Sequence, residues 1–270
     1  MIKKKFDQIC INVRKNILLS LFYAGSGHPG PSLSIVELLV YLYFEQFRFK
    51  KKKRIDKLIL SKGHAAPALY AVLVEKKILK DYHLKDLRKI NSPLQGHPDP
   101  NYLKEIDLGT GALGQGLSVG IGFSLANNFL KVKKDTYCIL GDGELQEGQI
   151  WEAAMFIGAK RILDLCTIVD QNKFQNELKV KDTLNMGSIK SKFISFGFEV
   201  LEINGHNYNQ LFKSFNYFKS KEKRSKPLCI ILKTTKGKGV SFMENDGDWH
   251  SKKINKEEFL NGMRELNLKI

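Results

Sequence analysis

Cysteine is scarce in this sequence: only four occur among 270 residues, and no two of them form a CxxC pair. The chain therefore offers neither a disulfide framework nor the cysteine spacing of a zinc site. Three of the four lie inside strand-like apolar runs, where cysteine behaves as a small buried apolar side chain. We expect reduced thiols in a reducing compartment, and a cytoplasmic protein. The residues are Cys10, Cys138, Cys166 and Cys229.

Long uninterrupted apolar runs are also missing. The longest Gly-rich apolar run, Gly111–Leu130, contains five polar residues, so we expect no transmembrane helix and no membrane partner. Near the start, a basic stretch precedes the apolar segment Ile17–Ala24, an arrangement compatible with a secretory signal. Apolar residues there recur at helical spacing, however, which favours an amphipathic helix packed on a domain. They are Phe6, Cys10, Val13, Ile17 and Leu21.

Acidic residues are outnumbered, with 28 Asp and Glu against 44 Lys and Arg, a net charge of +16. Much of the excess lies in runs such as Lys50–Arg54 and Lys221–Lys226. No run is interleaved with aromatics, and no helix-turn-helix, RNP or zinc-finger spacing occurs, so we expect solvated surface charge and no nucleic-acid partner. A positive field of this kind could attract anionic metabolites such as sugar phosphates, or an acidic protein.

Internal repeats, low-complexity linkers and breaks in composition are absent, which predicts a single domain over residues 1–270. Short aliphatic runs alternate with helix-length segments, a pattern typical of an α/β fold with a doubly wound, mostly parallel sheet and helices on both faces. Strands are expected at Lys57–Leu60, Thr136–Leu140, Leu165–Val169, Phe198–Ile203 and Leu228–Lys233. Helices are expected at 6–23, 34–46, 65–77, 114–130, 147–160, 186–196, 207–219 and 255–266.

Two of the predicted strands end in residues suited to a metal ion. The sequence Gly-Asp-Gly-Glu follows the second strand, with its aspartate at Asp142, and Asp-Gln-Asn follows the third, with its asparagine at Asn172. In an open α/β sheet, ligands bind beyond the carboxyl ends of the strands. Adjacent parallel strands would bring both side chains to one edge, where their oxygens suit Mg²⁺.

The histidines point to the same edge. Four of the six follow glycine directly, and a fifth, His250, follows Trp249 in a polar segment. Several loops of this type could converge on one pocket, where imidazoles donate to phosphates or hydroxyls and move protons near neutral pH. The glycine-flanked residues are His28, His64, His97 and His206.

Together these segments resemble transketolases, which are thiamine-diphosphate enzymes. The stretch GDGELQEGQIWEAAMFIGAK carries much of the resemblance. Further matches occur in transketolase order, at GSGHPG, SKGHA, GHP, TGALGQG and WH, and span residues 25–250. The resemblance implies ketol transfer between sugar phosphates, as in the pentose phosphate pathway, with the cofactor supplying the carbanion chemistry.

By resemblance, particular residues acquire expected roles. Mg²⁺, or Ca²⁺ or Mn²⁺ in its place, would be held by Asp142, Asn172 and the Phe174 carbonyl. His64 and Gly143 would lie at the cofactor diphosphate, and Gly111, Leu113 and Gly114 would let the backbone approach the thiamine. His28, His97 and His250 would face the sugar hydroxyls and the reacting carbon. His83 and His206 match no such position, and we expect structural or surface roles for both.

Two features have more than one interpretation. Glu147 matches a family glutamate that lies near the cofactor between subunits, yet it could equally be a capping carboxylate for the helix that begins there. Small residues spaced four apart, at 116, 120 and 124, permit close packing, either within the chain or against another subunit. Pro31 and Ser251 replace glycines that are usual in the family, which could alter loop shape or substrate access.

The resemblance also implies a partner. Transketolases of ordinary size are more than twice this length, and their second domain carries the glutamate that activates the cofactor's aminopyrimidine ring. We therefore expect a heterotetramer with a separate C-terminal, pyrimidine-binding subunit. Alternatives are a relative of 1-deoxyxylulose-phosphate synthase, a relative of 2-oxo-acid dehydrogenase α subunits, or a non-catalytic basic binding protein.

Overall fold

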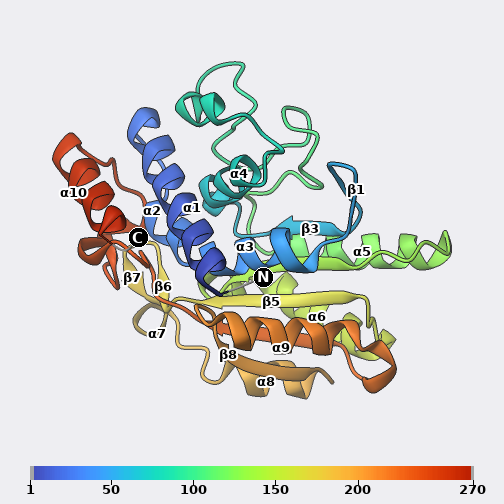
Figure 1. Ribbon diagram of the computed structural model, residues 1–270. Helices are drawn as coiled ribbons and strands as arrows, with labels where there is room; N and C mark the ends of the chain where they lie inside the picture. The colour runs from blue at the N-terminus through green and yellow to red at the C-terminus, as the bar shows by residue number, and fades with distance from the viewer. Residues whose placement is uncertain (1–2, 269–270) are drawn as a thin grey trace.

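A five-stranded parallel sheet forms the centre of the computed structural model, which describes residues 3–268 (Figure 1). The strands lie side by side in the order β3 (Lys57–Leu60), β4 (Thr136–Gly141), β5 (Leu165–Gln171), β9 (Leu228–Lys233) and β8 (Glu199–Asn204). All neighbouring pairs are parallel. Each predicted strand is present, with ends that differ by no more than two residues. The predicted α/β fold class is confirmed.

Helices cover both faces of the sheet because successive strand side chains point to opposite sides. In β4, Ile139 packs into one apolar cluster, while Cys138 and Leu140 pack into the other. Helices that contribute to the first cluster include α1 (Lys3–Ala24), α3 (Val36–Tyr41), α4 (Ala66–Glu75) and α9 (Tyr208–Lys219). Those that contribute to the second are α5 (Gln115–Phe129), α6 (Gly148–Lys160) and α8 (Ile189–Ser195).

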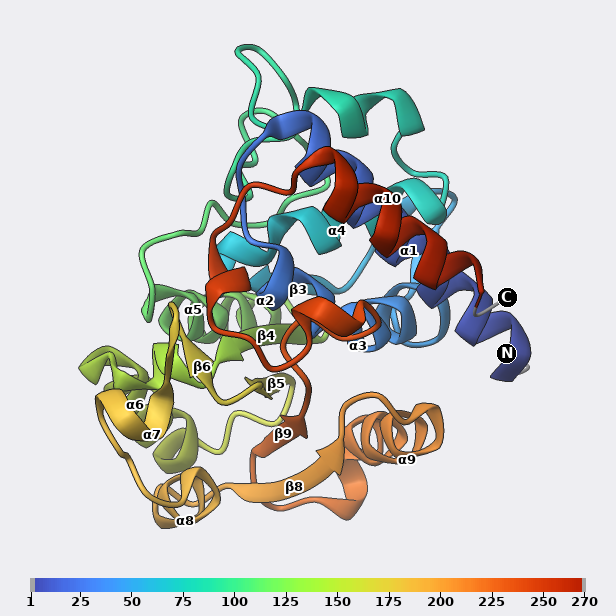
Figure 2. The same ribbon diagram turned by 90° about the vertical axis from the view of Figure 1, so that its left-hand side faces the viewer.

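Helix α1 has the amphipathic character that its sequence predicts. Its five periodic apolar residues, from Phe6 to Leu21, are all buried. It packs against α4 and against α10 (Lys256–Asn267), where the Phe22 and Phe259 rings stack with centroids 4.5 Å apart (Figure 2). None of the helices within residues 3–268 combines the length and the apolar character needed to cross a bilayer. The four cysteines are buried and free.

Several short elements were not predicted. They include α2 (Pro29–Leu33), α7 (Val180–Thr183) and two hairpins of two-residue strands. The helix expected over 34–46 is present as α3 followed by a π-helical turn (Leu42–Gln46). One hairpin pairs β1 (Phe49–Lys50) with β2 (Lys53–Arg54), and the other pairs β6 (Phe174–Gln175) with β7 (Leu178–Lys179). Helix α2 and the second hairpin both lie next to the carboxyl edge of the sheet, so they shape the site described below.

The small residues of α5 face inward. A Cβ on Gly116 would lie 2.4 Å from the Ser61 hydroxyl, and one on Gly120 would lie 3.1 Å from Leu165. The Ser124 hydroxyl donates to Asp164. Of the two interpretations offered for this stripe, the structure therefore supports packing within the chain, and it leaves the opposite face of α5 free for another contact.

Glycines in neighbouring helices should respond oppositely to the same change. A Cβ on Gly158 of α6 would lie 1.7 Å from the Phe196 carbonyl oxygen, whereas Gly122 of α5 has open space around it. Gly122→Ala should stabilise the isolated chain by up to about 1 kcal/mol through helix propensity. Gly158→Ala should destabilise it by about 1–3 kcal/mol, because backbone must move. Denaturant unfolding of both variants measures this; equal effects would contradict the packing described.

Candidate active site

A cavity of about 270 Å³ lies at the carboxyl edge of the sheet. Segments that follow β3, β4 and β5 form its walls, together with α2 and the 3₁₀ turn Asp248–His250. Ten of the residues singled out from sequence line it: His28, His64, Gly111, Leu113, Asp142, Gly143, Glu147, Asn172, Phe174 and His250. The other two, His97 and Gly114, lie directly beside it, as described below.

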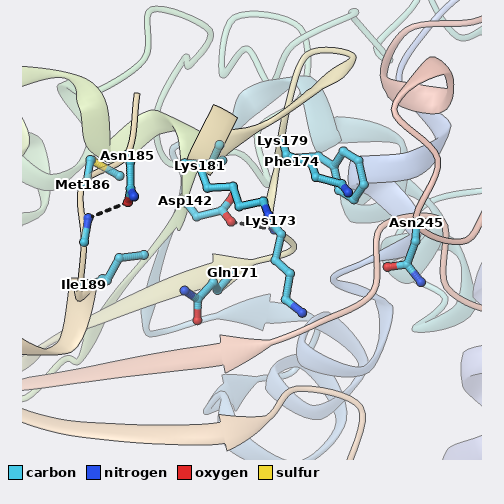
Figure 3. A pocket seen from close by; sticks show the side chains of 12 residues that line it. Asp142, Gln171, Lys173, Phe174, Lys179, Lys181, Asn185, Met186, Ile189 and Asn245 are labelled. Carbon is cyan, nitrogen blue, oxygen red and sulfur yellow. Dashed lines mark hydrogen bonds between the residues drawn. The ribbon is translucent and has the colours of Figure 1, made fainter. Parts of the chain in front are cut away.

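Adjacent strands deliver Asp142 and Asn172 to this cavity. The last residue of β4, Gly141, pairs in register with Asp170 of β5. The Asp142 carboxylate accepts hydrogen bonds from the Gly143 N–H at 3.0 Å and from the Lys173 N–H at 2.6 Å. Figure 3 shows this carboxylate directed at the Lys173 backbone. The Asp142 carboxylate therefore ties the end of β4 to the backbone that follows β5, at the edge of the sheet where the sequence predicts both residues.

The electrostatics around Asp142 suit a cation. Burial, and then the nearby Asp170 carboxylate, raise the pKa of Asp142 to about 7. No lysine, arginine or histidine within residues 3–268 forms a salt bridge with it. A divalent ion would stabilise the charged form of this buried carboxylate. The chemistry of the donors fits Mg²⁺, because an aspartate, an amide and a backbone carbonyl leave coordination positions for diphosphate oxygens.

Four imidazole rings lie close together at the cavity, and three of them line it. The His28 ring centroid lies 5.3 Å from that of His64, 5.4 Å from that of His250 and 6.4 Å from that of His97. Burial lowers the pKa of His28 to about 4, with help from Arg88, His97 and Lys62, and lowers that of His250 to about 3, with help from Lys236.

Burial also lowers the pKa of His64, next to Lys62, and that of His97, next to Arg88. All four rings are thus neutral near pH 7 and can both donate and accept hydrogen bonds. The Nδ1 atom of His28 is buried without a partner, although buried polar groups are normally paired. The cavity therefore contains unused hydrogen-bonding capacity of the kind that a polar ligand satisfies.

A buried ion pair that the sequence prediction missed lies beneath the cavity. The Lys62 ammonium is 2.5 Å from the Asp170 carboxylate, and both side chains have at most 1% of their surface exposed. The same carboxylate accepts from the Ser34 hydroxyl, the Thr234 hydroxyl and the Asn172 amide. Four chain segments thus meet at one carboxylate.

Glu144 and Lys236 were also missed. Buried Glu144 accepts from the Ser61 hydroxyl and from the N–H groups of Gly114 and Gly141, at 2.9 and 3.0 Å respectively. It thereby fixes the loop at Gly114, whose φ of +84° favours glycine. Lys236 is fully buried and donates to the carbonyls of Asn176 and Gly247. Neither was singled out, because a buried charge leaves no periodic signal in a sequence.

Glu147 precedes α6 and lines the cavity, but its side chain makes no hydrogen bond to the helix end. Glu147 therefore occupies the N-cap position of α6 without a capping hydrogen bond from its side chain. The Glu147 side chain is exposed in this chain. Beside it, Gln149 donates to the Leu113 carbonyl at 3.0 Å, and Gly111 lies so close to His97 that a Cβ would be 3.2 Å from that ring.

Of the two departures from the family pattern, neither disrupts the cavity. Pro31 contributes its carbonyl, which accepts from the Lys62 ammonium at 3.1 Å, and this bond does not depend on the side chain. Ser251 has φ −142°, a conformation that does not require glycine. His206 lies outside the cavity, where its Nδ1 is 2.9 Å from Glu37 and its Nε2 accepts from the Thr235 N–H.

Comparison with known proteins agrees with this geometry. Residues 8–268 match the family described as "Transketolase, thiamine diphosphate binding domain". The chain belongs to the transketolase family. It is 37% identical to the 6-deoxy-6-sulfo-D-fructose transketolase subunit SqwG of Clostridium sp. (strain MSTE9), across 94% of this chain and 93% of that one. It is 35% identical to an apulose-4-phosphate transketolase subunit of Phocaeicola vulgatus, across 95% and 92% of the two chains.

Solved transketolase structures share the fold. The enzyme from Campylobacter jejuni superimposes with a TM-score of 0.86 and 30% identity over 97% of this chain, which covers 43% of that one. Human transketolase is 37% identical over 86% of this chain, which corresponds to 37% of the human protein. The chain thus spans nearly the full length of two transketolase subunits and about two fifths of the single-chain transketolases.

The Lys62–Asp170 pair gives a testable prediction. Lys62→Met leaves the Asp170 charge buried and unpaired, so it should destabilise the chain by about 3–5 kcal/mol. The double variant Lys62→Met with Asp170→Asn should recover part of that loss, since no isolated charge remains. Denaturant unfolding of Lys62→Met, Asp170→Asn and the double variant measures the coupling free energy between the two side chains. Strictly additive effects would mean that the two groups do not interact.

Proposed function

We propose that this chain is the diphosphate- and metal-binding subunit of a transketolase, which transfers a two-carbon ketol unit from a ketose phosphate to an aldose phosphate. The observation that carries the proposal is the cavity that joins Asp142 and Asn172 to His28, His64 and His250, with His97 beside it. The chain matches the family model over residues 8–268, and two relatives named as transketolase subunits are of similar length. This likeness favours transketolase over the related synthase and dehydrogenase classes.

The cofactor end of the cavity is assigned to the strand edge. Asp142, the Asn172 amide oxygen and the Phe174 carbonyl would hold Mg²⁺, while His64 and the Gly143 backbone would bind the diphosphate. Gly143 packs tightly against the hairpin of β6 and β7, because a Cβ there would lie only 2.7 Å from the Gln175 side chain. Gly111, Leu113 and Gly114 would border the thiamine, which supplies the carbanion chemistry when bound.

The sugar end is assigned to His28, His97 and His250. Because their pKa values are lowered by burial, each ring is neutral at pH 7, so one nitrogen can accept a proton from a sugar hydroxyl and the ring N–H can donate a hydrogen bond. The ring centroids of His250 and His97 lie 5.4 and 6.4 Å from that of His28, so several hydroxyls of one sugar can be bound together. A ring that accepts a proton carries the charge until it returns that proton to the substrate.

We further propose a pyrimidine-binding partner subunit, in a heterotetramer. Helices α5 and α6 pack side by side and begin at the cavity, near Gly114 and Glu147. Along their outer face, large apolar side chains are exposed, and such contiguous exposure marks an interaction site. They are Leu125, Phe129, Leu130, Met155 and Phe156, with Phe129 87% exposed. A partner on this face would also bury Glu147, as expected for a residue between subunits.

The number of domains, the cellular location and the pathway are also part of the proposal. We propose one domain, because the two apolar clusters of the described residues lie on the two faces of the same five-stranded sheet. The four buried free thiols suit a cytoplasmic location, where disulfides are rare. If the chain carries out the proposed reaction, it belongs to the pentose phosphate pathway, in which sugar phosphates are interconverted.

Cofactor binding should appear as a thermal shift. Thiamine diphosphate with Mg²⁺ should raise the melting temperature of the chain, because a ligand of the native state stabilises it by mass action. Asp142→Asn should abolish most of the shift, whereas Asp7→Asn, at an exposed position on α1, should leave it intact. If the wild type shows no shift with or without its partner, or Asp142→Asn shifts equally, the proposed site is wrong.

Assembly should depend on the apolar face of α5. Phe129→Glu should weaken association with the pyrimidine-binding subunit by about tenfold or more, since it places a charge in an apolar contact. Leu260→Glu is the matched control. Leu260 is an exposed residue of α10, so this variant should assemble normally. Size-exclusion chromatography with light scattering measures the complex. Normal assembly of Phe129→Glu would place the partner elsewhere.

A further inference from the structure

A second cavity, of about 580 Å³, lies at the edge of the sheet opposite to the active-site cavity, and we call it the basic cavity. It is bordered by Asp135 and Asp164, which immediately precede β4 and β5, and by the last turns of α5 and α9. Figure 1 shows both helices ending on the side of the molecule away from α2 and from the hairpin of β6 and β7. Strands of six and seven residues separate the two cavities, which therefore lie on the order of 20 Å apart.

The lining of the basic cavity is strongly cationic. Eleven of the described residues form it, of which six are lysine or arginine, two are aspartate and one, Val132, is apolar. Asp135 is 2.6 Å from the Lys221 ammonium, and Asp164 accepts from the Ser124 hydroxyl. Three lysines of the lining form no salt bridge with any carboxylate of residues 3–268, so the chain does not neutralise their charge. They are Lys131, Lys133 and Lys134.

A buried amide in the wall lacks a hydrogen-bond partner. Asn127 lines the basic cavity with only 7% of its surface exposed, and its Nδ2 atom has no acceptor within residues 3–268. Buried polar groups are normally paired, so this donor requires an acceptor from outside the chain. The neighbouring lysines cannot supply one, because an ammonium group only donates. An anionic oxygen satisfies the amide and the lysines together.

The ordinary explanation for the lysines is that they are solvated and complement the negative end of the α5 dipole. It accounts for their charge, but not for the hollow that they line or for the unpaired Asn127 amide. A nucleic acid fits poorly, because no aromatic side chain of the described residues lines the basic cavity to stack on a base. The volume is typical of a small-molecule site, and a lining with one apolar residue suits a highly charged ligand.

We propose that the basic cavity binds a small metabolite that carries at least two phosphate groups. Three free ammonium groups carry more charge than one phosphate, at about −1.5 to −2 near pH 7, balances. The lysines supply the charge, and Asn127 donates to a phosphate oxygen from the wall. The inference is independent of the proposed function, because the basic cavity shares no lining residue with the active-site cavity.

The test is isothermal titration calorimetry of the full chain with inorganic pyrophosphate. Buffer without Mg²⁺ is used, so that the active-site cavity has no ion with which to hold a diphosphate. The wild type should bind one pyrophosphate per chain. Asn127→Leu should raise Kd by about tenfold or more, because it removes a donor to a charged group. The triple variant Lys131→Met, Lys133→Met, Lys134→Met should raise Kd by at least about as much.

Two controls separate this site from net charge and from the active-site cavity. The triple variant Lys3→Met, Lys4→Met, Lys5→Met removes the same charge from exposed positions on α1. Asp142→Asn changes the strand edge at the other cavity. Both should leave Kd within about twofold of the wild-type value, because distant charges are screened. Fructose 1,6-bisphosphate, titrated in the same way, distinguishes separated phosphates from adjacent ones, and this pattern with either probe supports the proposal.

Four results would overturn the proposal. The first is a wild type that binds neither probe. The second is an equal loss in the two lysine variants, which would mean that net charge alone attracts the anion. The third is an unchanged Kd in Asn127→Leu, which would reduce the lysines to an open charged surface. The fourth is a loss in Asp142→Asn, which would place the anion in the active-site cavity. If Asn127→Leu does not fold, Asn127→Asp keeps the side-chain shape and should also raise Kd.

Discussion

The buried contact between Lys62 and Asp170 is the interaction on which the site depends. Asp170 lies near the end of its strand within the apolar interior, and an unpaired charge there would be very costly. Lys62, which follows the edge strand β3, compensates it, and Ser34 and Thr234 complete its hydrogen bonds. One carboxylate therefore fixes the ends of β3, β5 and β9 and the helix α2 relative to one another.

The two aspartates at the carboxyl edge of the sheet, Asp170 and Asp142, have different roles. The charge of Asp170 is neutralised inside the protein, so it holds the fold together, while Asp142, one strand away, has no such partner and is available to a cation. Burial, together with the charges of Lys62 and Lys236, keeps His64 and His250 neutral. Both lysines are buried, so the charges that lower these two pKa values are not those of the lysine runs on the surface. Net charge and site electrostatics are thus separate properties of the molecule.

Much of the fold was predictable, because its strands are short, aliphatic and separated by helices of ordinary length. That Asp142 and Asn172 line one cavity was predictable from motifs at strand ends. The short elements were not: α2 carries the signal of a proline at its first position, Pro29, but its five residues are too few to show periodicity. The hairpin of β6 and β7 turns at Asn176, which has φ +48°. Asparagine is common in turns, but here it stands in a polar stretch that gives no strand pattern on either side.

Residues that act through burial were missed for a different reason. Glu144, Asp170 and Lys62 read as surface charges in a sequence, and only the three-dimensional contacts reveal that each is buried and bonded. Two questions that the sequence left open, the stripe of small residues on α5 and the capping role of Glu147, depend on which way side chains point. Neither composition nor spacing contains that information, because both directions are compatible with the same helix.

The central claim is that the ends of β4 and β5 form one metal–diphosphate site. The most direct measurement is a crystal structure of the chain with thiamine diphosphate and Mn²⁺, in which anomalous scattering locates the ion. We predict one ion bound by the Asp142 carboxylate, the Asn172 amide oxygen and the Phe174 carbonyl, at oxygen distances of roughly 2.0–2.3 Å. An ion elsewhere, or diphosphate bound without contact to these residues, would contradict it.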